Sequence, residues 1–311
     1  LVSLYRRLAI CGNRNGLKWR RLMNFEKAAN FIWENGRLLE RRLFEYFFLG
    51  GSKDGVLQAI KAYQNEDGGF GHALEPDLRT PDSQPLYVEF ALRTLYEAKI
   101  RDAELATRVC DYVSRVADLS EGIVTITASS RNYPRAWHWN NPASEQPSMY
   151  RLTSIVGLLN WQGIQHPWLD QAIEVCLKHI SDTRYEEAHI IQNAFCLLES
   201  LPQTDEIQKL YAKLADELYR ARFFRLEAPP REYGLTPLDF APVPDSYCRK
   251  IFSDTAIQDH LKVLETQQEE DGGWPLSWEP PGEMARLEWR AYRTLKCLIT
   301  LESYRTDGWD R

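Results

Sequence analysis

The stretch Gln64-Asn65-Glu66-Asp67-Gly68-Gly69-Phe70 decides how this sequence of 311 residues is interpreted, because it occurs a second time as Gln268-Glu269-Glu270-Asp271-Gly272-Gly273-Trp274. At the same distance beyond the aromatic residue, the copies continue as Leu74-Glu75-Pro76 and Trp278-Glu279-Pro280. An apolar helical pattern stands before and after each copy, so the repeated unit is helix, Gly-Gly turn, Pro-containing extended loop, helix. Such a repeat predicts a ring or solenoid of helix pairs, each too small to bury its own apolar face.

The repeated turn has a clear physical role. Asp-Gly-Gly supplies a positive φ without steric cost and ends the preceding helix. The amide of Gln64 or Gln268 can bond backbone groups left open at the helix end, and Phe70 or Trp274 can fold back as an apolar plug. These two aromatic residues and Trp278 are also candidates for lining a ligand cavity.

Both copies fit the pattern Gln-x-x-x-Gly-x-aromatic, which resembles the repeat motif (QW motif) of squalene and oxidosqualene cyclases. The Gly-Gly-aromatic turn also resembles the β-subunit of protein prenyltransferases, and the helix-pair pattern extends the resemblance over most of residues 23–311. The resemblance implies an all-α fold, an (α/α)6 toroid in one domain, whose inner helices enclose a pocket lined by aromatic residues. A fold of this kind does not by itself imply an activity.

Composition narrows the functional classes. Ten Trp, fifteen Tyr and twelve Phe suit either a thick helical core or an aromatic-walled cavity. Six cysteines without a Cys-x-x-Cys pair predict reduced thiols in a cytoplasmic protein. The net charge of -6 gives no footprint for nucleic acid, and no apolar stretch approaches the ~18 residues of a membrane span.

Residues 1–22 differ from the rest, because they contain six basic residues and no acidic one. Two interpretations stay open. The segment is either not part of the native protein, with the folded domain spanning 23–311, or a basic, weakly amphipathic arm that makes peripheral contact with anionic lipid.

Apolar periodicity predicts about twelve helices, the number that six hairpins require. Two tripeptides, Pro81-Asp82-Ser83 and Pro244-Asp245-Ser246, are expected to cap the helices that follow them. Eleven of these helices have predicted bounds, at residues 25–35, 39–47, 54–63, 86–98, 102–117, 147–162, 168–180, 184–200, 203–222, 254–267 and 283–303.

The chemical motifs of the related enzymes are absent. The sequence has neither the Asp-x-Asp-Asp motif of cyclases that protonate an alkene or epoxide nor the Asp-Asp-x-x-Asp motif that holds magnesium on a diphosphate. The zinc site of prenyltransferases could be imitated only by Asp245 and Cys248 with His260 or His189. That spacing departs from the family's Asp-x-Cys, so we expect no zinc and no other cofactor.

Acidic residues near the turns remain as catalytic candidates. Glu75 and Glu279 hold equivalent places in the two copies, and Asp77, Asp82 and Asp245 should lie at the same end of the ring. Two carboxylates in a partly apolar mouth can have their pKa values pushed apart, so that one acts as general acid and the other as base. The alternative is that both glutamates accept hydrogen bonds within their own loops and Asp82 and Asp245 cap helices.

The loop of residues 133–142 contains Trp137, His138 and Trp139. These side chains either pack over the ring or line its opening, where they would be candidates for binding substrate together with Asp245. A histidine near neutral pKa in an aromatic setting can carry protons.

Three functions stay open. The first is an enzyme of the cyclase or prenyltransferase type, acting on an isoprenoid or other apolar ligand by acid chemistry at Glu75, Asp77, Asp82 and Glu279. The second is a non-catalytic toroid that holds a ligand. The third is a carbohydrate-active enzyme of the glycoside hydrolase or lyase type, because helical toroids with rim carboxylates and stacking tryptophans also serve sugar chemistry.

Overall fold

The computed structural model describes residues 24–306, and within that range it contains twelve α-helices, four short 3-10 helices and no β-strand. The all-α prediction is therefore confirmed. The predicted basic arm, residues 1–22, lies outside the described residues. None of the helices in residues 24–306 is long and apolar enough to cross a membrane.

The α-helices follow one another with short connections, except that long segments precede α6, α8, α12, α13 and α14. Their bounds are α3 (Phe25–Asn35), α4 (Leu38–Phe48), α5 (Lys53–Lys61), α6 (Pro85–Glu97), α7 (Ala103–Val116), α8 (Met149–Gln162), α9 (Pro167–Asp182), α10 (Ala188–Glu199), α11 (Asp205–Leu218), α12 (Pro237–Phe240), α13 (Asp254–Thr266) and α14 (Glu283–Thr306).

One predicted helix start is corrected, and one short helix was missed. Helix α10 begins at Ala188 rather than 184, because Glu187 and Arg222 form a parallel bridge just before it. The single turn α12 was not predicted, since four residues in a Pro-rich loop carry no helical period.

The predicted caps are also wrong. The N-cap of α6 is Gln84, whose side chain accepts a hydrogen bond from the Thr127 N–H (2.7 Å) and makes no cap bond. The N-cap of α13 is Ser253, whose hydroxyl accepts from the Ala256 N–H. Asp82 and Asp245 therefore cap neither helix.

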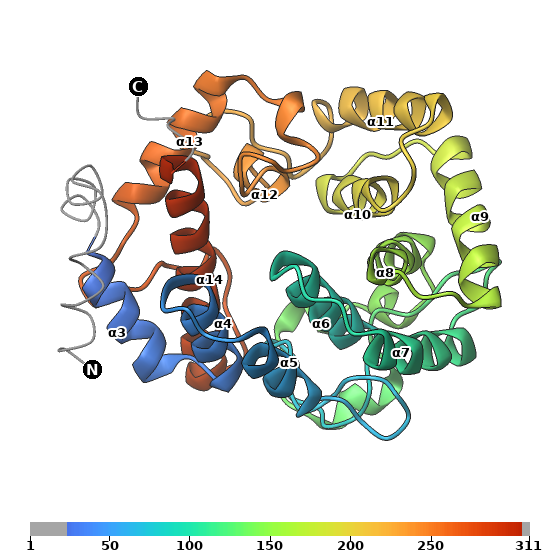
Figure 1. Cartoon of the computed structure of the whole chain (residues 1–311), viewed down its shortest axis with the longest axis horizontal. Helices are drawn as coiled ribbons and strands as arrows, with labels where there is room; N and C mark the ends of the chain where they lie inside the picture. The colour runs from blue at the N-terminus through green and yellow to red at the C-terminus, as the bar shows by residue number, and fades with distance from the viewer. Residues whose placement is uncertain (1–23, 307–311) are drawn as a thin grey trace.

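Neighbouring helices pack in a repeating order. Helix α4 contacts α3 and α5, α8 contacts α6, α7, α9 and α10, and α11 packs on α10. The C-terminal helix α14 contacts α3, α4 and α13, so the last helix of the described chain returns beside the first (Figure 1).

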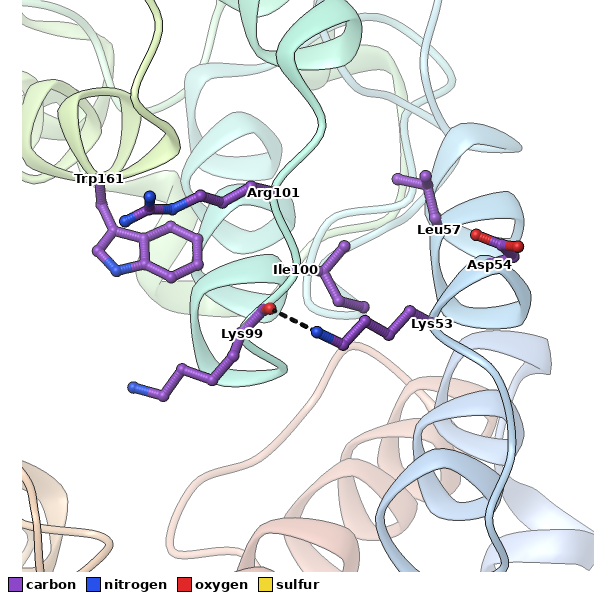
Figure 2. A pocket seen from close by; sticks show the side chains of 7 residues that line it. All are labelled: Lys53, Asp54, Leu57, Lys99, Ile100, Arg101 and Trp161. Carbon is purple, nitrogen blue, oxygen red and sulfur yellow. Dashed lines mark hydrogen bonds between the residues drawn. The ribbon is translucent and has the colours of Figure 1, made fainter.

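The connection between α6 and α7 is held firmly. Lys99 adopts a left-handed backbone with φ of 54°, and Ile100 donates its N–H to the Leu95 carbonyl. The buried Gln162 of α8 accepts from the Asp102 N–H and donates to the Ile100 carbonyl. This connection faces the start of α5, where the Lys53 ammonium donates to the Lys99 carbonyl at 3.4 Å (Figure 2).

The two Gly-Gly turns have the same hydrogen bonds, as their sequences predict. Gln64 donates from Nε2 to the Gly68 carbonyl at 3.0 Å, and Gln268 donates to the Gly272 carbonyl at 2.9 Å. The aspartate two residues before the second glycine accepts from that glycine's N–H in both copies. Phe70 and Trp274 are both fully buried, which confirms their role as apolar plugs.

Both turns also pack against a helix of another pair through their first glycine. Gly68 and Gly272 have φ of +90° and +93°. A Cβ on Gly68 would lie 2.3 Å from the Arg108 carbonyl oxygen in α7, and one on Gly272 would lie 2.4 Å from that of Lys27 in α3. The turn after α13 therefore packs on α3 as the turn after α5 packs on α7.

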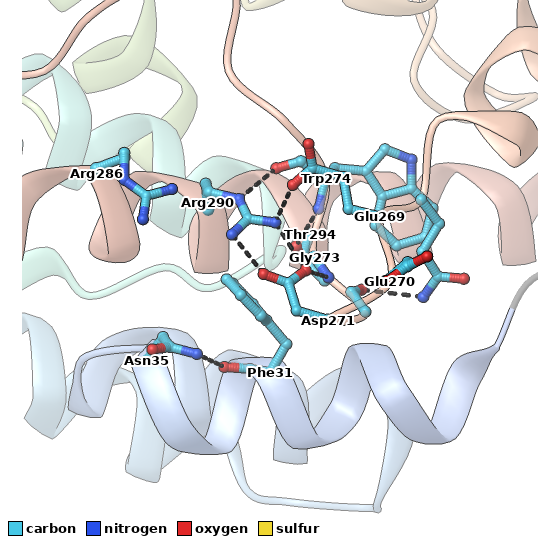
Figure 3. Close-up of polar contacts among 12 residues, drawn as sticks. Phe31, Asn35, Glu269, Glu270, Asp271, Gly273, Trp274, Arg286, Arg290 and Thr294 are labelled. Carbon is cyan, nitrogen blue, oxygen red and sulfur yellow. Dashed lines mark hydrogen bonds and ion pairs between the residues drawn. The ribbon is translucent and has the colours of Figure 1, made fainter. Parts of the chain in front are cut away.

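The second turn is tied to α14 by Arg290, which is buried (Figure 3). Arg290 donates to both carboxylate oxygens of Asp271, at 2.7 and 2.8 Å, and pairs with Glu269. Its guanidinium also lies over the Phe31 ring of α3, 4.5 Å from the ring centre. One side chain thus joins α3, α14 and the repeat turn.

Candidate functional site

The candidate site is built on the loop that follows the first Gly-Gly turn. A turn closed by the Leu78 N–H donating to the Glu75 carbonyl brings Glu75 and Asp77 together. Both side chains are buried, because Leu74 and Leu78 on either side of them are core residues. The two carboxyl groups are therefore held within one tight turn.

An arginine and a tyrosine side chain hold this turn by hydrogen bonds to its backbone carbonyls. Arg37 donates from Nη1 to the Leu74 carbonyl at 2.6 Å and to the Ala73 carbonyl at 3.1 Å. The buried Tyr87 hydroxyl donates to the Leu78 carbonyl. Arg37 itself forms an ion pair with the buried Glu40 at 2.5 Å, so the position of its guanidinium is restricted.

Tryptophan and histidine side chains surround the Asp77 carboxylate. Trp278 donates from its indole nitrogen to Oδ2 at 2.9 Å, and His138 Nε2 lies 3.8 Å from the same oxygen. The Trp289 indole N–H also acts on this carboxyl and lowers its pKa, although it has no hydrogen bond of good geometry. Asp77 Oδ1 is buried and has no hydrogen-bond partner among residues 24–306.

Burial raises the pKa of both carboxyl groups. Burial and then the charge of Asp77 raise the pKa of Glu75 well above its usual range, against the Asp77 N–H and the positive charges of Arg37 and Arg151. Burial raises the pKa of Asp77 to about 6, against the indole N–H groups of Trp289 and Trp278. The pair therefore contains a stronger and a weaker acid at neutral pH, as a general acid and base require.

The loop of residues 133–142 lies directly over this turn. Its backbone pairs with it through two hydrogen bonds, from the Arg79 N–H to the Pro134 carbonyl (3.0 Å) and from the Ala136 N–H to the Asp77 carbonyl (2.8 Å). This pairing places His138 beside Asp77. Burial lowers the pKa of His138, so its imidazole is neutral at pH 7.

The flanking tryptophans of that loop have different environments. Trp139 lies 4.6 Å from the His138 ring, and its indole nitrogen is buried without a hydrogen-bond partner in the described chain. Trp137 is 74% exposed, so its ring stands open to any ligand that approaches the loop.

Aromatic rings from α6 and α14 form a wall beside the acid pair. Trp289 lies 5.3 Å from Trp278, 6.0 Å from Phe90 and 5.6 Å from Tyr292, measured between ring centres. Because Trp278 and Trp289 both act on Asp77, this wall and the carboxyl pair belong to one site.

A network of charged residues on α6 and α8 lies next to the acid pair. Arg151 and Arg93 both pair with the buried Glu89, and Arg93 also donates to the Ser154 hydroxyl. The charge of Arg151 acts on Glu75, so this network reaches the acid pair.

The structure separates the other predicted acids from this pair. Glu279 is exposed, whereas Glu75 is buried, so Asp77 and not Glu279 is the carboxyl that acts on Glu75. Asp82 and Asp245 are exposed. Phe70 and Trp274 are core side chains with no exposed surface, which removes them from the predicted ligand-binding set.

The zinc candidates lie in different environments. Cys248 is buried and its thiol pKa is raised by burial, while Asp245 is exposed. His260 bonds the Leu226 carbonyl and His189 bonds the Tyr233 hydroxyl. Between residues 24 and 306 no three His, Cys, Asp or Glu side chains are arranged to hold a metal ion.

Three contributors to the site were not predicted from the sequence. Arg151 and Trp289 stand at ordinary positions of helical segments, Arg37 is the N-cap residue of α4, and none of the three belongs to a motif. The one available signal was the two-residue spacing of Glu75 and Asp77 around a proline, which is typical of a turn.

Comparisons with known proteins give information on the fold and not on the function. No model of a protein family matches the chain, and no curated protein matches it. A solved structure of a protein from Actinoplanes is similar, with a TM-score of 0.53 at 12% sequence identity. The match covers 90% of this chain and 98% of that one, so the similarity spans the whole fold.

Proposed function

We propose that this chain is an (α/α)6 toroid of the type found in squalene cyclases and the prenyltransferase β-subunit. Two observations support the ring. Helix α14 contacts α3, and the two repeat turns pack in the same way, Gly68 against Arg108 of α7 and Gly272 against Lys27 of α3. If each turn packs on the outer helix of the next pair, the last pair must be followed by the first, and the series closes into a ring.

We further propose that the protein is an enzyme that performs acid–base chemistry on a polyhydroxylated, sugar-like substrate. The observation that carries this proposal is the Glu75 and Asp77 pair, two buried carboxyl groups with raised pKa values, each with one oxygen that has no hydrogen-bond partner in residues 24–306. Buried polar atoms without partners are costly, and functional sites are where they occur.

The roles follow from the direction of the two pKa shifts. Burial raises the pKa of Glu75 well above its usual range, which favours its protonated form, so Glu75 would donate a proton to the leaving oxygen of a glycosidic bond. Asp77, with a pKa of about 6, is ionised at pH 7 and would take a proton from the attacking water. The indole N–H of Trp278 stabilises the ionised form of Asp77 and holds it in position.

Hydrogen-bonding capacity favours a sugar over an isoprenoid. The indole N–H of Trp139 and one carboxyl oxygen each of Glu75 and Asp77 have no hydrogen-bond partner in the described chain. A substrate with several hydroxyl groups can satisfy such atoms, whereas a hydrocarbon would leave them unpaired at a cost of ~1–3 kcal/mol each. Tryptophan faces suit the apolar face of a sugar ring.

An isoprenoid substrate remains the second candidate, because the wall of Phe90, Trp278, Trp289 and Tyr292 could stabilise a carbocation that a protonated Glu75 generates. The charged side chains of Arg37 and Arg151 close to Glu75 weigh against a cationic intermediate there.

Turnover of a substrate panel tests these proposals. The wild-type protein is incubated with neutral and acidic oligosaccharides, isoprenoid diphosphates and squalene, beside Glu75→Gln, Asp77→Asn and the exposed control Glu279→Gln. We expect one oligosaccharide class to be cleaved, with a loss of about 100-fold or more in the first two variants and little change in the third. Turnover of an isoprenoid alone would replace the sugar proposal. Ligand binding without turnover by any of the four proteins would refute the enzyme proposal.

A further inference from the structure

We infer that a second binding site, for a small phosphate monoester, lies at the opposite end of α6 from the acid pair. A cleft of about 540 Å³ lies there, lined by Lys53, Asp54, Leu57, Lys99, Ile100, Arg101 and Trp161. Helix α6 has 13 residues, so its two ends are ~20 Å apart at 1.5 Å per residue. The cleft is therefore distinct from the site around Glu75 and Asp77.

The charge of the cleft points to a dianion. Lys53, Lys99 and Arg101 are exposed, and none of them forms an ion pair within residues 24–306. Asp54 is the one acid that lines the cleft, which leaves a net charge of about +2. A phosphate monoester carries about -1.5 to -2 at neutral pH and matches that charge.

The neighbouring acids do not alter this balance. The charge of Lys99 acts to lower the pKa of Glu199. The Glu199 carboxyl, however, accepts a hydrogen bond from the Tyr96 hydroxyl at 2.5 Å and does not line the cleft. Asp102 is paired with Lys61 at 3.0 Å. Figure 2 shows the Asp54 carboxylate beside Leu57, at the opposite side of the view from Arg101.

The cationic groups are held in place before any ligand binds. Buried Ile100 and the two hydrogen bonds that Gln162 makes, one accepted from the Asp102 N–H and one donated to the Ile100 carbonyl, fix the backbone that carries Lys99 and Arg101. The Arg101 guanidinium lies 4.8 Å from the Trp161 ring centre, and the Lys99 ammonium lies 5.0 Å from that of Tyr96. Such ordering reduces the entropy lost on binding.

The half-buried indole of Trp161 gives the cleft an apolar wall for the organic part of the ligand. A volume of about 540 Å³ is within the usual range for small-molecule sites. Phosphate for the cations and a flat or ring-shaped group for the indole together define the ligand class as a phosphorylated small molecule such as a sugar phosphate.

Calorimetric titration tests this site, with glucose 6-phosphate as the probe at low ionic strength and glucose as the uncharged comparison. We expect glucose 6-phosphate to bind and glucose not to bind, with affinity falling as salt is added. A Lys99→Ala, Arg101→Ala double variant should bind about tenfold more weakly or worse. Asp54→Asn should bind more tightly, because it removes the opposing charge.

Matched controls separate this site from general charge effects and from the acid pair. Lys262→Ala, an exposed lysine paired with Asp259, should bind as the wild type does. Asp77→Asn should also bind glucose 6-phosphate with unchanged affinity. The test of this site is therefore independent of the enzyme proposal. The inference is overturned if the double variant binds as well as the wild type, or if glucose 6-phosphate gives no binding at ~10 mM. Binding of a single-stranded DNA oligomer without binding of the monoester would also overturn it.

Discussion

The indole nitrogen of Trp278 donates a 2.9 Å hydrogen bond to Oδ2 of Asp77, a residue 201 positions earlier in the chain. Trp278 follows the second Gly-Gly turn and Asp77 follows the first, so the loops of the two repeats meet at this bond. The site is therefore formed by both copies of the repeat, through a tryptophan of one and an acid of the other.

Removing that donor should raise the pKa of Asp77. In Trp278→Phe the ring is retained but the N–H is lost, so the ionised carboxylate loses roughly 1.5 kcal/mol and its pKa should rise from about 6 to about 7. Carboxyl carbon chemical shifts measured against pH would report the change. Trp137→Phe, at the 74% exposed ring, is the control and should leave the pKa of Asp77 unchanged.

Stability should fall as the pH rises through the pKa of Asp77. Its pKa is about 6 in the folded state against about 3.9 in an unfolded chain, so folding favours the protonated form. This stabilisation is complete below pH ~4 and is lost as the pH passes ~6, by about 3 kcal/mol. Glu75 acts in the same direction.

Urea unfolding of Asp77→Asn between pH 4 and 7.5 checks this sign. The variant should lose part of the decline seen in the wild type, because the amide does not titrate. Glu279→Gln, at an exposed carboxyl, should follow the wild-type curve. Parallel curves for Asp77→Asn and the wild type would show that Asp77 titrates normally.

Substitution of Gly272 should weaken the contact that joins the last helix pair to the first. In Gly272→Ala the new Cβ meets the Lys27 backbone and the φ of +93° is strained. We expect a loss of at least about 2 kcal/mol in the free energy of unfolding. Gly282→Ala, where nothing lies within 4 Å of the new Cβ, should change it by about 0.5 kcal/mol or less. Equal losses in both variants would remove the special role of this contact.

Arg290→Met should destabilise the second repeat turn in a pH-dependent way. The buried guanidinium satisfies Asp271, Glu269 and the Trp274 carbonyl, and it lowers the pKa of Asp271. The variant should lose roughly 2 kcal/mol or more near pH 7. Because the folded-state pKa of Asp271 is depressed, its part of the stabilisation is present above pH ~4 and disappears as the pH falls below it.

Thermal unfolding of Arg290→Met and the wild type between pH 2.5 and 7 would show whether the gap narrows in acid. Arg286→Met is the matched control, since Arg286 pairs with the exposed Glu283 and should be worth about 0.5 kcal/mol or less. A gap that is constant with pH would mean that Arg290 acts through its contacts with Phe31 and the Trp274 carbonyl and not through its carboxylate partners.

The repeat was the part of the fold that could be predicted from sequence. Its turns depend on local chemistry, and the bonds of Gln64 and Gln268 and the positive φ of Gly68 and Gly272 follow from the residue types alone. The helix caps were mispredicted, because Gln84 bonds to Thr127, 43 residues away, and no local rule anticipates that contact.

The site was only partly predictable, because its partners come from distant segments. Glu75 and Asp77 were identified, but Glu279 was predicted as the second acid on the basis of symmetry. The two copies are not equivalent in the fold, since Glu279 is exposed while the turn at Leu78 buries Asp77 beside Glu75. Arg151 and Trp289 join them through packing of helices whose neighbours the sequence does not specify.

The most direct test of the central claim, that Glu75 and Asp77 are one coupled acid pair, is a carboxyl NMR titration of the protein labelled with ¹³C at Asp and Glu carboxyl carbons. The Asp77→Asn and Glu75→Gln spectra assign the two signals. We predict that Asp77 titrates at about 6, that Glu75 titrates well above its usual range, and that Asp77→Asn lowers the pKa of Glu75. Two independent titrations near pH 4 would contradict the pair and the acid–base function proposed for it.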